Sequence, residues 1–165
     1  MDLDRVILGV SDLEAAARRL EERHRLTAVP GGRHEAAGTH NWIVPLDDAY
    51  IELIAVEDPE TARRHPFGRW VLHGATDDCA WIGWVLRTDD IDATCARLGL
   101  EPHPMQRGSL RWRMAGFQRA FREPSLPFFI QGTCRSPSFP AGPAVRRRQA
   151  TRGSRRWRWA PTRRP

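Results

Sequence analysis

Short apolar runs alternate, early in the chain, with one stretch whose apolar residues recur at helical spacing. The run RVILGV at Arg5–Val10 predicts a β-strand. The next residues, Ser11 to Glu14, match a capping box with Ser11 as the N-cap of a helix. Beyond the cap, apolar positions lie three and four residues apart, at Leu13, Ala16, Ala17 and Leu20. The pattern therefore predicts a strand followed by an amphipathic helix.

Three further apolar runs complete the first half of the chain. Leu26–Val29 is a short strand candidate, and Pro30–Gly32 has the composition of a turn. Thr39–Leu46 and Tyr50–Val56 are longer runs joined by a turn that contains two aspartates, which predicts a hairpin. The predicted order of the first half is βαβββ.

The second half repeats this pattern at an offset of 78 residues. The offset places Asp12–Leu20 on Asp90–Leu98, with Asp, Ala, Arg and Leu at matching positions. The second-half strand candidates are WIGWVLR, LEPHPM, SLRWRM and LPFFIQ, with a short helix, GFQRAFRE, before the last. We expect an α+β protein of two βαβββ modules, at about residues 1–60 and 80–131. A chance match between common helix-forming residues is the alternative.

The basic character of the chain belongs to its last residues. The formal charge is +6 overall, but residues 132–165 hold ten Arg and no acid, so the rest of the chain is net negative. This Arg- and Pro-rich tail has no apolar periodicity, which predicts disorder. Arg interleaved with Trp157 and Trp159 also fits nonspecific nucleic-acid binding. A reading-frame shift in a GC-rich gene is the hypothesis that we favour for the tail.

Cysteine usage and hydropathy indicate a protein of the reducing cytoplasm. Cys79, Cys95 and Cys134 are odd in number and widely spaced, which fits neither a disulfide framework nor a zinc knuckle. No apolar stretch approaches the ~20 residues that a membrane span needs. The sequence leaves the oligomeric state open, a homodimer included.

Several motifs together give the chain a resemblance to a known family. These are GGRH…GTHN…PL at Gly31–Leu46, YIELI at Tyr50–Ile54, RTDDIDA at Arg87–Ala93 and LPFFIQ at Leu126–Gln131. With the βαβββ pattern, the chain resembles the glyoxalase-like domain family of the vicinal oxygen chelate superfamily. The resemblance implies curved sheets around a cavity, in which members hold a divalent metal and carry out lyase or isomerase chemistry, or only bind a ligand.

The resemblance also implies where metal ligands would lie, in the first and last strands of each module. The first-strand position is Arg5 and its second-module counterpart is Gly83. The last-strand positions are Glu52 and, at the same offset, Ile130, or Gln131 with one gap. Because only Glu52 is a convincing ligand, the sequence predicts no metal site, and a divalent metal rests on the resemblance alone.

Strand alternation sorts the polar residues around Thr39–Leu46. Thr39 and Asn41 fall on one face and His40 on the other. We expect Thr39 and Asn41, with His34 from the preceding loop, to bind a small ligand, the alternative being polar decoration of an edge strand. His40 fits a packed or surface histidine.

Three more charged residues have candidate roles. Glu52 lies on a mostly apolar face, which fits either a general base of raised pKa or, as we favour, an ion pair with Arg5. Arg111 and Arg113 flank Trp112 and share a face, so Arg113 is a candidate for binding a substrate carboxylate, with a solvated surface as the blander interpretation.

The sequence thus favours a glyoxalase-like protein that binds a small oxygen-rich metabolite, with Glu52 as the catalytic candidate if there is turnover. A binding or sequestering protein without turnover is the alternative. Nucleic-acid binding through the tail is the third hypothesis.

Overall fold

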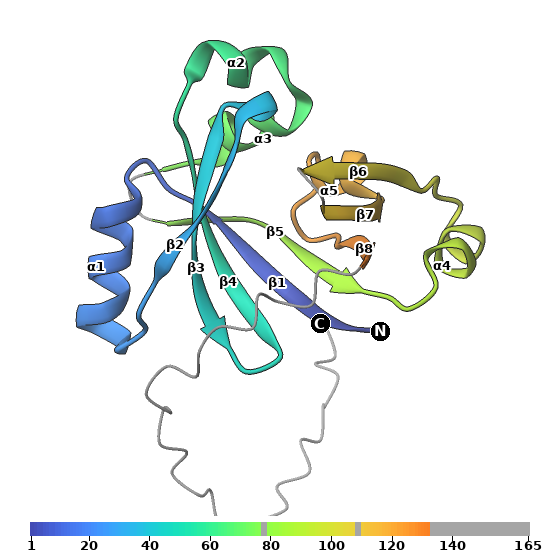
Figure 1. Ribbon diagram of the computed structural model, residues 1–165, viewed down its shortest axis with the longest axis horizontal. Helices are drawn as coiled ribbons and strands as arrows, with labels where there is room; N and C mark the ends of the chain where they lie inside the picture. The colour runs from blue at the N-terminus through green and yellow to red at the C-terminus, as the bar shows by residue number, and fades with distance from the viewer. Residues whose placement is uncertain (77–78, 108–109, 133–165) are drawn as a thin grey trace, which may run out of the picture.

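The computed structural model describes residues 1–76, 79–107 and 110–132, and these form an eight-stranded sheet with helices on both faces. The strand order is β2-β3-β4-β1-β5-β8-β7-β6, and the sheet curls into a half-barrel (Figure 1). Strands β1 (Asp2–Gly9) and β5 (Ala80–Arg87) pair antiparallel at its centre. The predicted α+β class is confirmed.

The two predicted βαβββ modules are both present. Each has its first strand parallel to its last, β1 to β4 and β5 to β8. The first module continues from β1 with α1 (Leu13–His24), β2 (Val29–His34), β3 (Thr39–Leu46) and β4 (Ala49–Val56). The second continues from β5 with α4 (Ile91–Leu98), β6 (His103–Arg107), β7 (Leu110–Ala115) and β8 (Phe128–Gly132).

Two local predictions in the first module are wrong. The N-cap of α1 is Asp12, whose carboxylate accepts a hydrogen bond from the Ala15 amide, and not Ser11. The predicted strand at Leu26–Val29 and turn at Pro30–Gly32 are replaced by β2, which begins at Val29. An irregular register between Pro30 and Arg33 lets the glycines stay within the strand.

The segment between the modules contains two helices where no element was predicted. They are α2 (Pro59–Arg64) and α3 (Pro66–Gly74). Each has a proline in its first turn and a side-chain cap, from Asp58 and His65, which explains why they form despite their short length. Two shorter helices are η1 (Glu35–Ala37) and α5 (Phe117–Ala120), the latter shorter than predicted.

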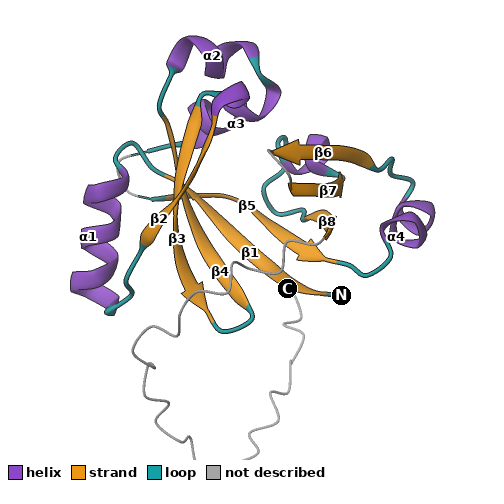
Figure 2. Ribbon diagram, in the orientation of Figure 1, coloured by secondary structure: helices purple, strands orange, loops and turns teal. Residues whose placement is uncertain are grey.

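The two faces of the sheet bury different helices. Trp70 and Val71 of α3 and Ala120 of α5 pack on the concave face, against Ile7, Ile54, Ile82, Val85, Phe128 and Ile130. The opposite face packs on α1 and, through Ile91 and Cys95, on α4. Figure 2 shows α1 and α4 far apart, with α2 and α3 grouped at another side. The concave face is therefore covered mainly by the segment that links the modules.

The predicted disordered tail at 132–165 lies outside the described residues, except for Gly132 at the end of β8. The frameshift and nucleic-acid hypotheses fall on the same residues. Among the residues that the structure does describe, no helix is both long and apolar enough to cross a membrane.

Candidate functional site

A cluster of polar side chains lies on the concave face of the first module. In the parallel pairing of β1 with β4, Arg5 lies beside Tyr50 and Ile7 beside Glu52. Because Ile7 and Ile54 belong to the concave core, strand alternation puts Arg5, Tyr50 and Glu52 on the same face. We call Asp4, Arg5, Asn41, Tyr50 and Glu52 the first-module polar site.

Arg5 is the centre of this site. Its Nε lies 2.8 Å from Oε2 of Glu52, and its Nη1 donates a hydrogen bond to Oδ1 of Asp4 at 2.5 Å. Asp4 is also 3.5 Å from Nη1 of Arg87, and the Tyr50 ring centroid is 5.5 Å from Cζ of Arg5. Asp4 and Glu52 are only 3% and 4% exposed, so both carboxylates depend on the guanidinium groups for charge compensation. The favoured ion pair of Glu52 with Arg5 is present, and the general-base role of Glu52 stays a prediction.

The contact between Arg5 and Glu52 is electrostatic and is not a well-aligned hydrogen bond. The Nε atom is buried and makes no hydrogen bond within the described residues, although it is close to the carboxylate. Burial disfavours the charged guanidinium, but the acidic groups of Tyr50, Glu52 and Asp4 outweigh it and raise the pKa of Arg5. Burial also raises the pKa of Tyr50, against the opposing effect of Arg5. Both residues therefore keep their protons well above neutral pH.

Asn41 connects β2 to Glu52. Its Nδ2 donates a hydrogen bond to Oε1 of Glu52, and its Oδ1 accepts one from the Gly32 amide at 2.7 Å. A Cβ on Gly31 would lie 2.3 Å from that same Oδ1, so only glycine lets the β2 backbone approach the amide this closely. The Gly-Gly pair predicted as a turn thus holds the Asn41 side chain in place, and Asn41 fixes Glu52.

His34 and Thr39 form a separate pair on this module. Nδ1 of His34 lies 3.0 Å from Oγ1 of Thr39, and the His34 ring meets Phe67 of α3 edge-on. Thr39 pairs with Val56 in the β3–β4 ladder, whereas Glu52 pairs with Ile43, so the two groups are four residues apart along the strand. The structure brings Asn41 to Glu52 and leaves Thr39 further along β3, with His34 opposite it at the end of β2 and not in a loop.

His40 and Arg113 lie away from the first-module polar site. His40 is 3.9 Å from Glu57, a carboxylate held mainly by Arg33, in agreement with a surface role. Arg113 donates two hydrogen bonds, of 2.7 and 2.6 Å, to Asp92 of α4. Since β1, β5 and β8 lie between β4 and β7 in the sheet, the structure does not bring Arg113 to Glu52.

The second-module counterparts of the metal-ligand positions do not fit a metal ion. Gly83 lies under α3, where a Cβ would be 3.0 Å from Cζ2 of Trp70. Ile130 belongs to the concave apolar core. The Gln131 side chain points to the start of α4, where it bonds the Asp89 carbonyl and the Ile91 amide.

On the first-module side, the place of a cation beside Glu52 is taken by Arg5. Within the residues described, no three His, Cys, Asp or Glu side chains are grouped as a metal site. A divalent ion prefers several oxygen ligands, and this site offers it only the two carboxylates of Asp4 and Glu52, both already paired with Arg5. The residues present therefore do not fit the metal that the family resemblance implies.

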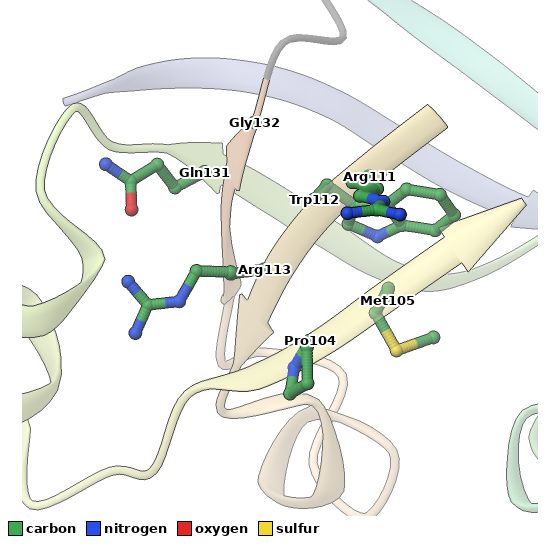
Figure 3. Close-up of a pocket in the computed structure, with 7 residues that line it drawn as sticks. All are labelled: Pro104, Met105, Arg111, Trp112, Arg113, Gln131 and Gly132. Carbon is green, nitrogen blue, oxygen red and sulfur yellow. The ribbon is translucent and has the colours of Figure 1, made fainter. Parts of the chain in front are cut away.

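A second candidate place is an open hollow of about 710 Å³ on the second module. Figure 3 shows that Arg113 and Gln131 extend to one side of it, while Trp112 and Met105 lie on the other. The polar ends of Arg113 and Gln131 are already bonded, to Asp92 and to backbone groups of the β5–α4 loop. The side chains of Arg113 and Gln131 are therefore not free to bind a ligand in the hollow unless they give up these bonds.

Sequence reasoning missed Asp4 and Tyr50 as members of the site, and Arg87 as a second partner of Asp4. Asp4 and Arg5 contact each other although they are adjacent, which a regular strand would prevent; the register of β1 with β5 shifts between Leu3 and Arg5. The signal available in the sequence is the adjacent opposite charges of Asp4 and Arg5, directly before the apolar run VILG.

Comparison with known proteins agrees with this fold. A family model described as a glyoxalase-like domain matches residues 3–143. Among curated proteins, none matches the chain significantly. The match extends past Gln131, where the predicted domain ended.

Solved structures with the same fold include two methylmalonyl-CoA epimerases. That of Streptomyces coelicolor, in complex with 2-nitronate-propionyl-CoA, is 16% identical, with 82% of this chain and 96% of that one covered and a TM-score of 0.58. That of Mycobacterium tuberculosis is 18% identical, with 79% and 87% covered and a TM-score of 0.56. A hypothetical protein from Staphylococcus aureus is 19% identical, with 80% and 59% covered and a TM-score of 0.58. At these identities the likeness shows the fold alone.

Proposed function

Because the chain belongs to the glyoxalase-like domain family, we propose that its first-module polar site binds a small oxygen-rich metabolite without a metal ion. The observation that carries this proposal is the buried series Asp4–Arg5–Glu52–Asn41 on the concave face. Buried polar groups are costly to maintain, so such a series on an otherwise apolar face favours a binding role.

The charges of the site limit the kind of ligand. Two buried carboxylates, Asp4 and Glu52, face two guanidinium groups, Arg5 and Arg87. This balance gives no excess positive charge for a multiply charged anion, and it favours carbonyl, hydroxyl or single carboxylate oxygens. The Arg5 side chain is 14% exposed, which leaves its edge within reach of such a ligand.

The geometry supports binding better than turnover. One oxygen of Glu52 is engaged by Arg5 and the other by Asn41, so the carboxylate acts as a structural partner more readily than as a general base. Isomerase or lyase chemistry is the second candidate. It is favoured by the burial of Glu52 on the concave face, and it requires a ligand that draws Arg5 or Asn41 away.

The proposal is tested by titrating the full chain, freed of metal by a chelator, with pyruvate, lactate and their neutral counterparts methyl pyruvate and lactamide. We expect saturable binding of at least one probe, measured by ligand-observed NMR. Asn41→Ala should weaken the binding of that probe at least about tenfold, because the buried Glu52 carboxylate loses the hydrogen bond from Asn41. Arg64→Ala, on the exposed face of α2, is the matched control.

Equal affinity in the Asn41 and Arg64 variants would contradict the proposal. Turnover is detected in the same samples by exchange of the lactate α-hydrogen with solvent deuterium. Exchange that stops in Glu52→Gln would favour the catalytic alternative, and binding without exchange would favour a binding protein.

A further inference from the structure

We infer that the Arg5 guanidinium is the resident cation of the first-module polar site, in place of a divalent metal, and that ligand oxygens bind directly to it. The part of this inference that concerns the ligand rests on the proposed function. The part that concerns the cation rests on the geometry of Asp4, Arg5 and Glu52 alone.

The guanidinium lies between two buried carboxylates. Its Nη1 contacts Asp4, and its Nε faces Glu52 at 2.8 Å. Burial has already removed most of the water around both carboxylates. Without a cation between them, the two negative charges would repel each other. A planar, permanently charged group with five donors can neutralise both at once, which a single lysine ammonium does less well.

The guanidinium fork of Arg5 has more N–H donors than its contacts with the described part of the chain engage. Within the described residues Nη1 donates to Asp4, Nε makes an ionic contact with Glu52, and Tyr50 adds a side-chain contact, which together engage fewer than the five N–H donors. The Tyr50 ring, 5.5 Å from Cζ, borders one side of the guanidinium. A guanidinium edge matches two neighbouring oxygens, as in a carboxylate or a 2-oxo acid, in the way that a metal would be chelated.

The second module leaves no room for a metal opposite Arg5. The indole of Trp70 covers Gly83, and it stacks on Phe121 of the segment after α5 at 4.5 Å between ring centroids. Ile130, at the position equivalent to Glu52, packs in the same core. A metal bound beside Glu52 would therefore have to displace Arg5 without gaining ligands from the second module.

The test compares the full chain with Arg5→Ala and with Arg64→Ala, an exposed arginine, as control. We expect wild-type protein to bind no stoichiometric Mn²⁺. Arg5→Ala should melt at a lower temperature and bind pyruvate at least about tenfold more weakly, as is typical when one partner of a buried charge pair is truncated. Methylguanidinium at millimolar concentration should raise the melting temperature of Arg5→Ala and leave that of the other two proteins unchanged.

The inference is overturned if wild-type protein takes up one equivalent of Mn²⁺ at micromolar concentration. It is also overturned if Arg5→Ala keeps the wild-type melting temperature, or loses stability with no response to methylguanidinium. If Arg5→Ala does not fold, Arg5→Lys takes its place: a folded variant with weaker pyruvate binding supports the role of the fork, and unchanged binding contradicts it. Rescue by methylguanidinium in a protein that binds none of the four probes would support the resident cation and reject the proposed function.

Discussion

The two modules have the same scaffold but opposite linings on the concave face. Their first helices are capped alike, by Asp12 and Asp90, each accepting from the amide three residues on. Ile7 and its counterpart Val85 are both fully buried. Yet the first-module residues Arg5, Tyr50 and Glu52 correspond to Gly83, Phe128 and Ile130 in the second.

The different linings of the two modules show how a small domain can keep a buried polar site and remain stable. The second module contributes apolar core, filled by Trp70 of α3, and so supplies stability through burial. The first module carries charged groups that are satisfied by one another. The duplicated fold thus separates an apolar core from a buried polar site, and substitutions on the two sides should behave differently.

The largest effect is expected from Trp70→Ala, which removes the side chain that fills the second module. Trp70 is 7% exposed, and truncation of a buried tryptophan costs about 3–5 kcal/mol in unfolding free energy. Trp81→Ala is the control, because Trp81 is 50% exposed, and its effect should be at most about 1 kcal/mol. Denaturant unfolding measures both; similar losses would show that α3 does not stabilise the concave core.

The next largest effect is expected from Glu52→Gln on the polar side. The change leaves Arg5 with Asp4 as its remaining carboxylate partner and should cost about 2 kcal/mol, as for a hydrogen-bonded charged group. Glu57→Gln makes the same chemical change in an ion pair with Arg33 at the surface, where a smaller loss is expected. If urea unfolding gives the two variants equal midpoints, the buried pair does not have the role assigned to it.

The caps of the two modules should have equal effects. Asp12→Ala and Asp90→Ala each remove one carboxylate from a helix N-terminus and should each cost about 1 kcal/mol. Thermal unfolding of both variants compares them directly. A loss in one module alone would indicate that the repeat does not extend to its helix caps.

The smallest effect is expected from Arg113→Ala. Its partner Asp92 is exposed, and the bond from Arg113 lowers the pKa of that carboxyl. The stabilising contribution of the Asp92 carboxylate is therefore present above its unfolded pKa and is lost as the pH falls through its lower folded value. In Arg113→Ala an NMR titration should place the Asp92 pKa closer to the ordinary range, with pyruvate binding unchanged; weaker binding would move the ligand site to the second module.

Much of this fold follows from periodicity in the sequence. Alternation placed Thr39 and Asn41 on one face and His40 on the other, and the structure agrees, with Asn41 on Glu52 and His40 near Glu57. The family motifs and the offset of 78 residues also led to the two modules. Strand alternation is a local property, so sequence alone reveals it.

Other features depend on contacts that periodicity does not encode. The helices α2 and α3 are too short to show a helical pattern, and their stability comes from caps and from Trp70 packing on the sheet. The contact of Asp4 with Arg5 depends on a register shift against β5. Residue type makes Arg113 a candidate for ligand binding, which stays a prediction, and its partner Asp92 on α4 is 21 residues away, so the sequence does not reveal the pair.

The central claim, that the first-module polar site binds the ligand, has a direct reporter in Tyr50, the single tyrosine of the chain, which lies beside Arg5. The measurement is the ¹H NMR spectrum of the tyrosine ring during titration of the metal-free full chain with pyruvate and methyl pyruvate. The account predicts a saturable shift of the Tyr50 signals that is lost in Arg5→Ala. Saturable binding that leaves Tyr50 unchanged and shifts the indole signal of Trp112 in the second-module hollow would contradict it.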